Sequence, residues 1–298
     1  MIRHIKEAPG VTQLKVNLIG AGRVGQTFLR LLSANPNCVI QDVMSTNYQS
    51  ALNAVEFAGA GHAVKEVSEL RPADLWLLSV PDSQISAVAN SLAEVLGSDG
   101  PQAKAPVAVH FSGFFAAYEM APLGALGWRL ASVHPVLSFS DPETALKRFS
   151  GTYCGLEGDD AALALVDPLL VRMGARTFPI RSEHKSLYHA AAVISNNFTV
   201  VLQAIAREAW AAAGVPDEIA RELNTSLLRA TYENVTALGP RDALTGPAAR
   251  GDAYVVDRQG EDVADWHAAA GVLYREMSAL AHRLKAEGKT LADTEPES

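Results

Sequence analysis

The segment that most constrains the fold is a glycine loop near the start of the chain, Gly20-Ala21-Gly22-Arg23-Val24-Gly25. It follows an apolar stretch, residues 14–19, and precedes residues 23–33, whose apolar positions have helical spacing. In a strand–loop–helix unit the three glycines allow a tight turn, close approach of the backbone to a pyrophosphate, and close helix packing. The unpaired N–H groups that begin the helix favour an anion. The loop therefore predicts a dinucleotide site; the alternative is a glycine turn used only for packing.

Two patterns divide the chain. Up to about residue 180, short apolar runs alternate with helical stretches, and residues 75–80 are apolar enough for a strand buried on both faces. We expect Asp82 to cap the helix that follows this strand. Beyond residue 182 the pattern is Ala-rich and helical, with a polar, Gly- and Pro-punctuated loop at 245–252 and a last helix at about 262–287.

We therefore predict an α/β fold in two domains. Residues 1–181 form a Rossmann domain with a doubly wound, mainly parallel sheet. Residues 182–298 form an all-helical domain for substrate binding and dimerisation.

The choice of cofactor depends on the end of the second strand. NAD enzymes place an acid about 20 residues beyond the third glycine to hold the ribose hydroxyls. Here that position is Ser45, followed by Thr46 and Asn47, which offer donors to a 2′-phosphate, and Arg23 adds a charge. NADP is favoured and NAD remains possible. The alternative is that these residues form only a polar turn.

Three later strands end in short motifs that contain polar residues. These motifs lie at the sheet edge where ligands of open α/β sheets bind. Val80 and Pro81 are expected to border the ribose and nicotinamide, and Ser112 to contact nicotinamide or substrate. His134 is a candidate general acid or base, or a hydrogen-bonded loop residue. For His110, inside a strand, a packing role is favoured.

One helix face in the second domain carries a polar stripe. At 100° per residue, Lys185, His189 and Asn196 lie within about 40° of one another. Such a stripe must meet water, a cleft or other polar groups, because an unpaired buried charge is costly. We expect a cleft facing the nicotinamide, with a surface or interhelix network as the alternative. In the loop, Arg250 is a candidate clamp for a substrate carboxylate, held by Asp252, or part of a structural turn.

Composition excludes several classes of protein. The net charge of −8 disfavours a nucleic-acid binder, which presents basic residues to phosphates. The two cysteines form no C-x-x-C pair, so no metal site is expected. Residues 1–13 lack the apolar core of a signal peptide, and no long uncharged apolar stretch predicts a membrane span. We expect a cytoplasmic protein.

Taken in order, the motifs resemble a known group. They are the glycine loop, Ser79-Val80-Pro81-Asp82, His110-Phe111-Ser112-Gly113, His134-Pro135 with Ser138-Phe139, Lys185 with Tyr188-His189, and residues 244–252. The chain resembles an uncharacterised family of short Rossmann-like oxidoreductases with a helical C-terminal domain of unknown function. That family is similar to the 6-phosphogluconate dehydrogenase-like group, which includes β-hydroxyacid dehydrogenases, ketopantoate and pyrroline-5-carboxylate reductases and F420-dependent NADP oxidoreductase.

The resemblance implies a Rossmann domain, a helical dimerisation domain and a cleft between them. Lys185 matches the lysine of β-hydroxyacid dehydrogenases, whereas His189 occupies the place of their asparagine. The hypothesis is an NADP-preferring oxidoreductase acting on a small, carboxylate-bearing carbonyl/alcohol or imine/amine substrate. Lys185 is the catalytic candidate that donates or accepts the proton, and His189 and His134 orient it or share that role. Asn196 and Arg250 are the candidate substrate residues, and the protein is expected to be a homodimer. The alternatives are a non-catalytic NADP-binding sensor or scaffold, and deazaflavin-linked electron transfer.

Overall fold

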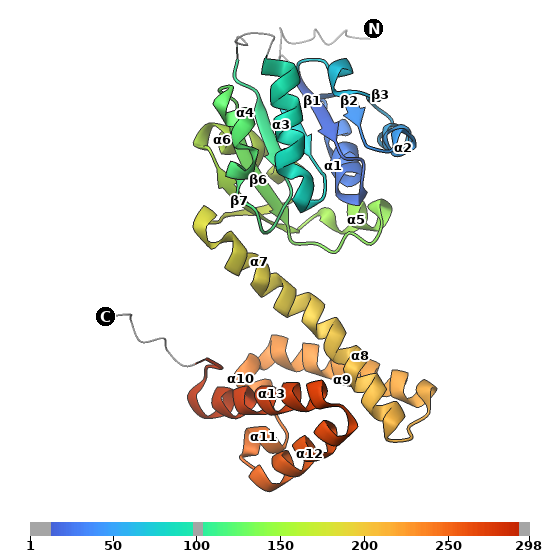
Figure 1. The fold of residues 1–298 in the computed structure, drawn as a ribbon, viewed down its shortest axis with the longest axis vertical. Helices are drawn as coiled ribbons and strands as arrows, with labels where there is room; N and C mark the ends of the chain where they lie inside the picture. The colour runs from blue at the N-terminus through green and yellow to red at the C-terminus, as the bar shows by residue number, and fades with distance from the viewer. Residues whose placement is uncertain (1–12, 98–103, 292–298) are drawn as a thin grey trace, which may run out of the picture. The chain divides into compact units, whose positions relative to one another are not determined.

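The computed structural model describes residues 13–97 and 104–291, which form two compact units divided after Ala192 (Figure 1). Residues 1–12, on which the absence of a signal peptide was predicted, lie outside the described residues. The sequence placed the domain boundary before Ser182, and the first unit extends beyond it to include helix α7 (Lys185–Val193) almost entirely.

The first unit contains one eight-stranded sheet with the strand order β3-β2-β1-β4-β5-β6-β7-β8. All neighbours are parallel except β6 and β7, which are antiparallel. The predicted Rossmann sheet is thereby confirmed. The strands are β1 (Leu14–Ile19), β2 (Cys38–Met44), β3 (His62–Val64), β4 (Leu75–Leu78), β5 (Val107–His110), β6 (Arg129–Pro135), β7 (Tyr153–Gly158) and β8 (Arg176–Pro179).

Helices cover both faces of this sheet and create two apolar cores (Figure 1). The position of β4 between the two cores explains why its sequence is continuously apolar. Leu75 and Leu77 enter one core, while Trp76 and Leu78 enter the other. The first core is covered by α1 (Arg23–Ser33), α2 (Tyr48–Ala58), α5 (Pro142–Phe149) and α6 (Asp160–Arg172), and the second by α3 (Ile85–Leu96) and α4 (Ala121–Ala125).

The predicted cap of α3 is wrong. Asp82 begins a 3₁₀ turn, η2 (Asp82–Gln84), and α3 follows it without a side-chain cap. The carboxylate of Asp82 instead accepts a hydrogen bond from the hydroxyl of Ser112 at 2.8 Å. A contact 30 residues along the chain has replaced the local one.

The second unit is all-helical, as predicted. After a π-helical turn, η6 (Ile194–Phe198), it contains α8 (Thr199–Ala212), α9 (Asp217–Leu238), α10 (Pro240–Ala243), α11 (Pro247–Arg250), α12 (Ala253–Trp266) and α13 (Ala268–Glu287).

Two details of the second unit differ from the prediction. The expected last helix is two helices, α12 and α13, with an extended residue, His267, between them. The expected loop at 245–252 contains a short helix, α11. Its proline occupies the first turn, where a missing N–H is tolerated, and Gly246 and Gly251 flank the helix with positive φ rather than interrupting it.

An aromatic cluster joins α1 and α5 in the first core. Phe149 is fully buried, and its ring meets that of Phe28 edge-on at 5.4 Å. We predict that Phe149→Ala lowers the free energy of unfolding by about 3–5 kcal/mol, because it removes a large buried ring and leaves a cavity. Urea unfolding measures this change. Val171→Ala, at a position 54% exposed, is the control and should cost less than about 0.5 kcal/mol. Equal effects of the two substitutions would contradict the assigned core.

Candidate functional site

The glycine loop lies at the carboxyl end of β1, where the strand order reverses between β1 and β4. Gly20 has a φ of 93°, and a Cβ there would overlap the backbone of Ser79; a Cβ on Gly25 would overlap the carbonyl of Gly20. Gly22 differs from both, since a Cβ on it would meet nothing within 4 Å. Helix α1 follows without a side-chain cap. The loop thus presents uncapped N–H groups and open space, a geometry that fits a pyrophosphate.

The turn after β2 contains the three residues predicted to bind the 2′-phosphate. Thr46 and Asn47 are exposed, and Asn47 also caps α2 by accepting the N–H of Gln49 at 2.9 Å. The nearby acid, Asp42, is fully buried and accepts hydrogen bonds from the backbone N–H and the guanidinium of Arg71. Its carboxylate is therefore occupied within the protein.

The loops after β4 and β5 are tied together at the same edge of the sheet. Besides its bond to Asp82, the hydroxyl of Ser112 accepts the N–H groups of Phe114 and Phe115 at 3.1 and 2.9 Å. His110 is fully buried; its Nδ1 accepts the N–H of Ser112, so its Nε2 donates to the carbonyl of Ala116 at 3.0 Å. Burial lowers the pKa of His110 to about 4. His110 therefore has the packing role that the sequence favoured.

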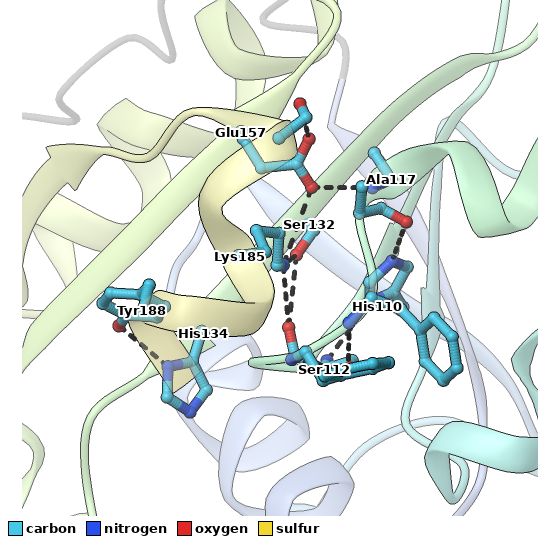
Figure 2. A network of polar contacts seen from close by, with 12 residues as sticks. His110, Ser112, Ala117, Ser132, His134, Glu157, Lys185 and Tyr188 are labelled. Atoms are coloured by element: carbon cyan, nitrogen blue, oxygen red, sulfur yellow. Dashed lines mark hydrogen bonds and ion pairs between the residues drawn. The ribbon is translucent and has the colours of Figure 1, made fainter. Parts of the chain in front are cut away.

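A second polar group surrounds Gly113, and two of its members, His134 and Tyr188, are labelled in Figure 2. Nδ1 of His134 lies 2.8 Å from the hydroxyl oxygen of Tyr188, and the rings of His134 and His189 are 5.6 Å apart. A Cβ on Gly113 would overlap the ring of His189 and lie 2.8 Å from Nε2 of His134, so both imidazoles press against this glycine. Opposite His134 across the β6–β7 ladder is Gly155, where a Cβ would lie 3.1 Å from the Tyr188 hydroxyl.

The protonation of this group is set mainly by burial. Burial, followed by the neighbouring His189 and Lys185, lowers the pKa of His134 to about 4. Burial also raises the pKa of Tyr188 to about 12. At neutral pH the pair consists of a neutral imidazole and a neutral phenol, each able to donate and accept a hydrogen bond.

Lys185 begins α7 and is only 1% exposed. Its ammonium donates to the carbonyl of Ser112 at 2.8 Å and to the hydroxyl of Ser132, and lies 3.6 Å from a carboxylate oxygen of Glu157 (Figure 2). Burial lowers the pKa of Lys185 to about 8, against the opposing effect of Glu157.

Four predicted residues are thus brought together in the first unit: Ser112, His134, Lys185 and His189. Asn196 and Arg250 belong to the second unit and stay predictions. Asn196 lies in the π-helical turn, so the uniform 100° step on which the stripe was predicted ends before it. Asp252 caps α12 by accepting the N–H of Val255 at 3.5 Å, rather than holding Arg250.

Three members of the group were not assigned to the site from the sequence: Ser132, Glu157 and Tyr188. Ser132 and Glu157 face each other across the antiparallel β6–β7 ladder, and both are buried. The available signal was a polar residue within a mainly apolar part of each strand. The sequence gives no means of pairing them, because strand register depends on the whole sheet.

Family models match two segments of the chain. Residues 5–135 match the family of Rossmann-like domains, and residues 152–281 match a domain of unknown function, DUF2520. The chain therefore joins a Rossmann-like domain to a DUF2520 domain, which confirms the combination that the motifs indicated. No curated protein sequence matches the chain.

Solved structures share this architecture over nearly the whole chain. A protein of Thermotoga maritima is 28% identical, with a TM-score of 0.73, and the match covers 92% of this chain and 99% of that one. A candidate NADP oxidoreductase from Bacteroides fragilis is 22% identical, with a TM-score of 0.69 and coverages of 92% and 100%. A pyrroline-5-carboxylate reductase from Coxiella burnetii is 14% identical, with a TM-score of 0.55 and coverages of 89% and 97%. The latter two show similarity of fold.

The depressed pKa values of His110 and His134 predict a loss of stability in acid. These two imidazoles take up protons near pH 6.5 in the unfolded chain but only near pH 4 in the folded chain. Their contribution to the free energy of unfolding is therefore complete above pH 6.5 and is lost as the pH falls towards 4. Each group should contribute at most about 1.4 kcal/mol per pH unit in this range. We expect urea unfolding of His134→Gln to show a shallower pH dependence than the wild type, with the exposed His62→Gln as control. Identical slopes for wild type and His134→Gln would refute the assignment.

Proposed function

We propose that the chain is an NAD(P)-dependent oxidoreductase that transfers a hydride between the nicotinamide and a small, carboxylate-bearing carbonyl/alcohol or imine/amine substrate. The observation that carries the proposal is the open space at Gly22, beside the uncapped start of α1 and at the reversal of strand order. The fold shared with a pyrroline-5-carboxylate reductase and a candidate NADP oxidoreductase supports it. The bound dinucleotide would supply or accept the hydride, and the protein the proton.

NADP is the favoured cofactor. The turn after β2 offers Ser45, Thr46 and Asn47 to a 2′-phosphate, and Arg23, the first residue of α1, would add a positive charge. Asp42 is the acid that would otherwise repel the phosphate, and its carboxylate forms an ion pair with the guanidinium of Arg71, with an N–O distance of 2.6 Å. An NAD enzyme needs a free carboxylate here to hold the ribose hydroxyls, so NAD is the weaker alternative.

The residues around Gly113 are proposed to handle the proton and orient the substrate. His134 and His189 are the imidazoles beside this glycine, at the same carboxyl edge of the sheet as the dinucleotide loop. Lys185, the third catalytic candidate, lies behind the Ser112 carbonyl. Val80, Pro81 and Ser112 are proposed to border the cofactor. Asn196 and Arg250 remain the proposed substrate residues, Arg250 through a bidentate contact with a carboxylate.

Gly22→Ala tests the dinucleotide site directly. The backbone at Gly22 has φ −74° and ψ −175°, which alanine adopts freely, and its Cβ would point into open space. We therefore expect an unchanged melting temperature but a dissociation constant for NADPH raised at least about 10-fold, because the methyl group occupies the pyrophosphate position. Titration of NADPH fluorescence and thermal unfolding measure the two effects. Equal NADPH affinity in wild type and variant would contradict the site. Gly25→Ala is the matched control, which should lower stability as well.

A non-catalytic NADP-binding sensor or scaffold is the second candidate function. It would bind NADPH through the same loop, but it has no need for the two imidazoles around Gly113. Screening 2- and 3-hydroxy acids for reduction of NADP, with wild type and His134→Gln, distinguishes the candidates. Turnover that depends on His134 supports the enzyme; tight binding of NADPH without turnover of any substrate supports the sensor.

We further propose that the protein is a homodimer through its second unit. Among the described residues of that unit only Ala220, Asn224, Gly260 and Gly271 are buried, which is too small a core for independent stability. Its longest helix, α9, exposes a series of large apolar residues at helical spacing: Ile219, Leu223, Leu227, Leu228, Tyr232, Val235 and Leu238. A second copy would bury these surfaces.

A membrane is the other environment that could cover apolar helices. The run Ser182–Ala212 is long and apolar enough, by length and composition alone, to cross a bilayer. It nevertheless contains Lys185, whose ammonium pairs within the first unit, and Arg207, which pairs with Asp217 at 2.5 Å. Charges placed in this way favour a protein partner over lipid.

Leu227→Asp tests the dimer. Leu227 is 57% exposed on α9, so a carboxylate there would be desolvated by a second copy and should shift the mass in light scattering from dimer to monomer. Leu52→Asp, at a position 38% exposed on α2, is the control and should leave the mass unchanged. A monomeric wild type, or one that is recovered only in detergent, would refute the proposal.

A further inference from the structure

We propose that Glu157 and Lys185 act as one buried positioning unit, which fixes the Ser112–Gly113 peptide and the first turn of α7 and thereby places His134, Tyr188 and His189 around Gly113. The proposal rests on the proposed function, since it assigns these residues a role in the same site. It also changes the role of Lys185, which would act through its neighbours rather than donate the proton itself.

Glu157 connects three segments that are distant in sequence. It lies in β7 and is 4% exposed. One carboxylate oxygen accepts the backbone N–H of Ala117 at 2.6 Å and lies 3.6 Å from the ammonium of Lys185. The other accepts the hydroxyl of Ser182 at 2.7 Å, directly before α7. Because both oxygens have partners within the protein and the side chain is 4% exposed, Glu157 holds the entry to α7 against the sheet.

Lys185 completes the unit from the side of α7. An ammonium has three N–H donors, and the carbonyl of Ser112, the hydroxyl of Ser132 and the carboxylate of Glu157 provide three partners. Ser132 stands opposite Glu157 in the β6–β7 ladder, so the register of these strands brings two of the partners together. With its donors engaged and the side chain 1% exposed, Lys185 cannot reach a substrate without giving up one of them.

The bond from Lys185 to the Ser112 carbonyl also orients the next N–H group. A trans peptide is planar, with C=O and N–H on opposite sides, so the N–H of Gly113 points away from Lys185. Gly113 is buried, and this N–H has no hydrogen-bond partner among the residues that the structure describes. An unpaired buried donor beside two imidazoles is available to an oxygen of a bound ligand.

The same unit sets the position of two aromatic side chains. Tyr188 and His189 follow Lys185 by three and four residues in α7, so they lie on its face of the helix. On β6, His134 follows Ser132 by two residues and therefore shares its face of the sheet. Fixing Lys185 to Ser132 consequently fixes Tyr188 and His189 against His134. The Tyr188 hydroxyl oxygen then lies 2.8 Å from Nδ1 of His134, and the ring centroids of His134 and His189 lie 5.6 Å apart.

A double-mutant cycle separates a positioning unit from a lysine that donates the proton. The variants are Glu157→Gln, Lys185→Met and the double mutant, with Glu183→Gln, an exposed neighbour paired with Arg181, as control. If Glu157 and Lys185 form one positioning unit, each single variant should lower kcat by about 10–100-fold. The double mutant should then be no less active than the less active of the two single variants. NADPH affinity should change much less than kcat, since the glycine loop is not involved.

Imidazole NMR signals give a readout that does not need turnover. We expect the His134 and His189 signals to shift in Glu157→Gln and in Lys185→Met but not in Glu183→Gln. In Lys185→Met the pKa of His134 should also rise, because the ammonium helps to lower it. If Lys185→Met does not fold, Ser132→Ala removes one of its contacts and should shift the same signals to a smaller extent.

Two outcomes would overturn the proposal. Near-normal kcat in Glu157→Gln, together with an inactive Lys185→Met, would identify Lys185 as an independent proton donor. Unchanged His134 and His189 signals in Glu157→Gln would exclude positioning, whatever the activity. Failure of the wild type to bind NADPH would instead refute the proposed function and leave the NMR result to decide the positioning role.

Discussion

The buried ammonium of Lys185 is the constraint on which the geometry of the site depends. A charge that is 1% exposed is tolerated only with charged and hydrogen-bonding partners, because its desolvation is otherwise costly. Those partners come from the end of β5, from β6 and from β7. Satisfying one lysine therefore requires three strands and α7 to adopt one relative arrangement. The antiparallel pairing of β7 with β6 is essential, because it sets Glu157 opposite Ser132.

Much of this could be predicted from local sequence. The glycine loop predicted the turn after β1 and the start of α1, because the steric need at Gly20 and Gly25 is met by glycine alone. The strand-end positions of Ser112 and His134 followed from apolar runs, and the pairing of Lys185 with His189 from helical spacing. Each of these inferences needs only residues near one another in the chain, or the rule that parallel strands share one carboxyl edge.

The rest depended on contacts that no local pattern encodes. Glu157 could not be assigned, because its partners lie 25 to 40 residues away and depend on strand register. Asp82 was predicted as a helix cap, yet its carboxylate accepts a hydrogen bond from the hydroxyl of Ser112 instead. In the second unit, apolar periodicity continues through His267, so the break between α12 and α13 leaves no periodic signal. The π-helical turn at Ile194–Phe198 is similarly invisible to a count at 100° per residue.

The electrostatics of the group fit a reaction in which charge develops on a ligand oxygen. His134 and Tyr188 are uncharged at neutral pH, because burial opposes ionisation of both. The positive charge lies one peptide further back, on Lys185, and Glu157 partly offsets it at 3.6 Å. A negative oxygen beside the N–H of Gly113 would therefore meet neutral donors in contact and a cation behind the Ser112 carbonyl. Fixed dipoles of this kind stabilise developing charge without reorganising, which is the advantage of holding Lys185 in place rather than exposing it.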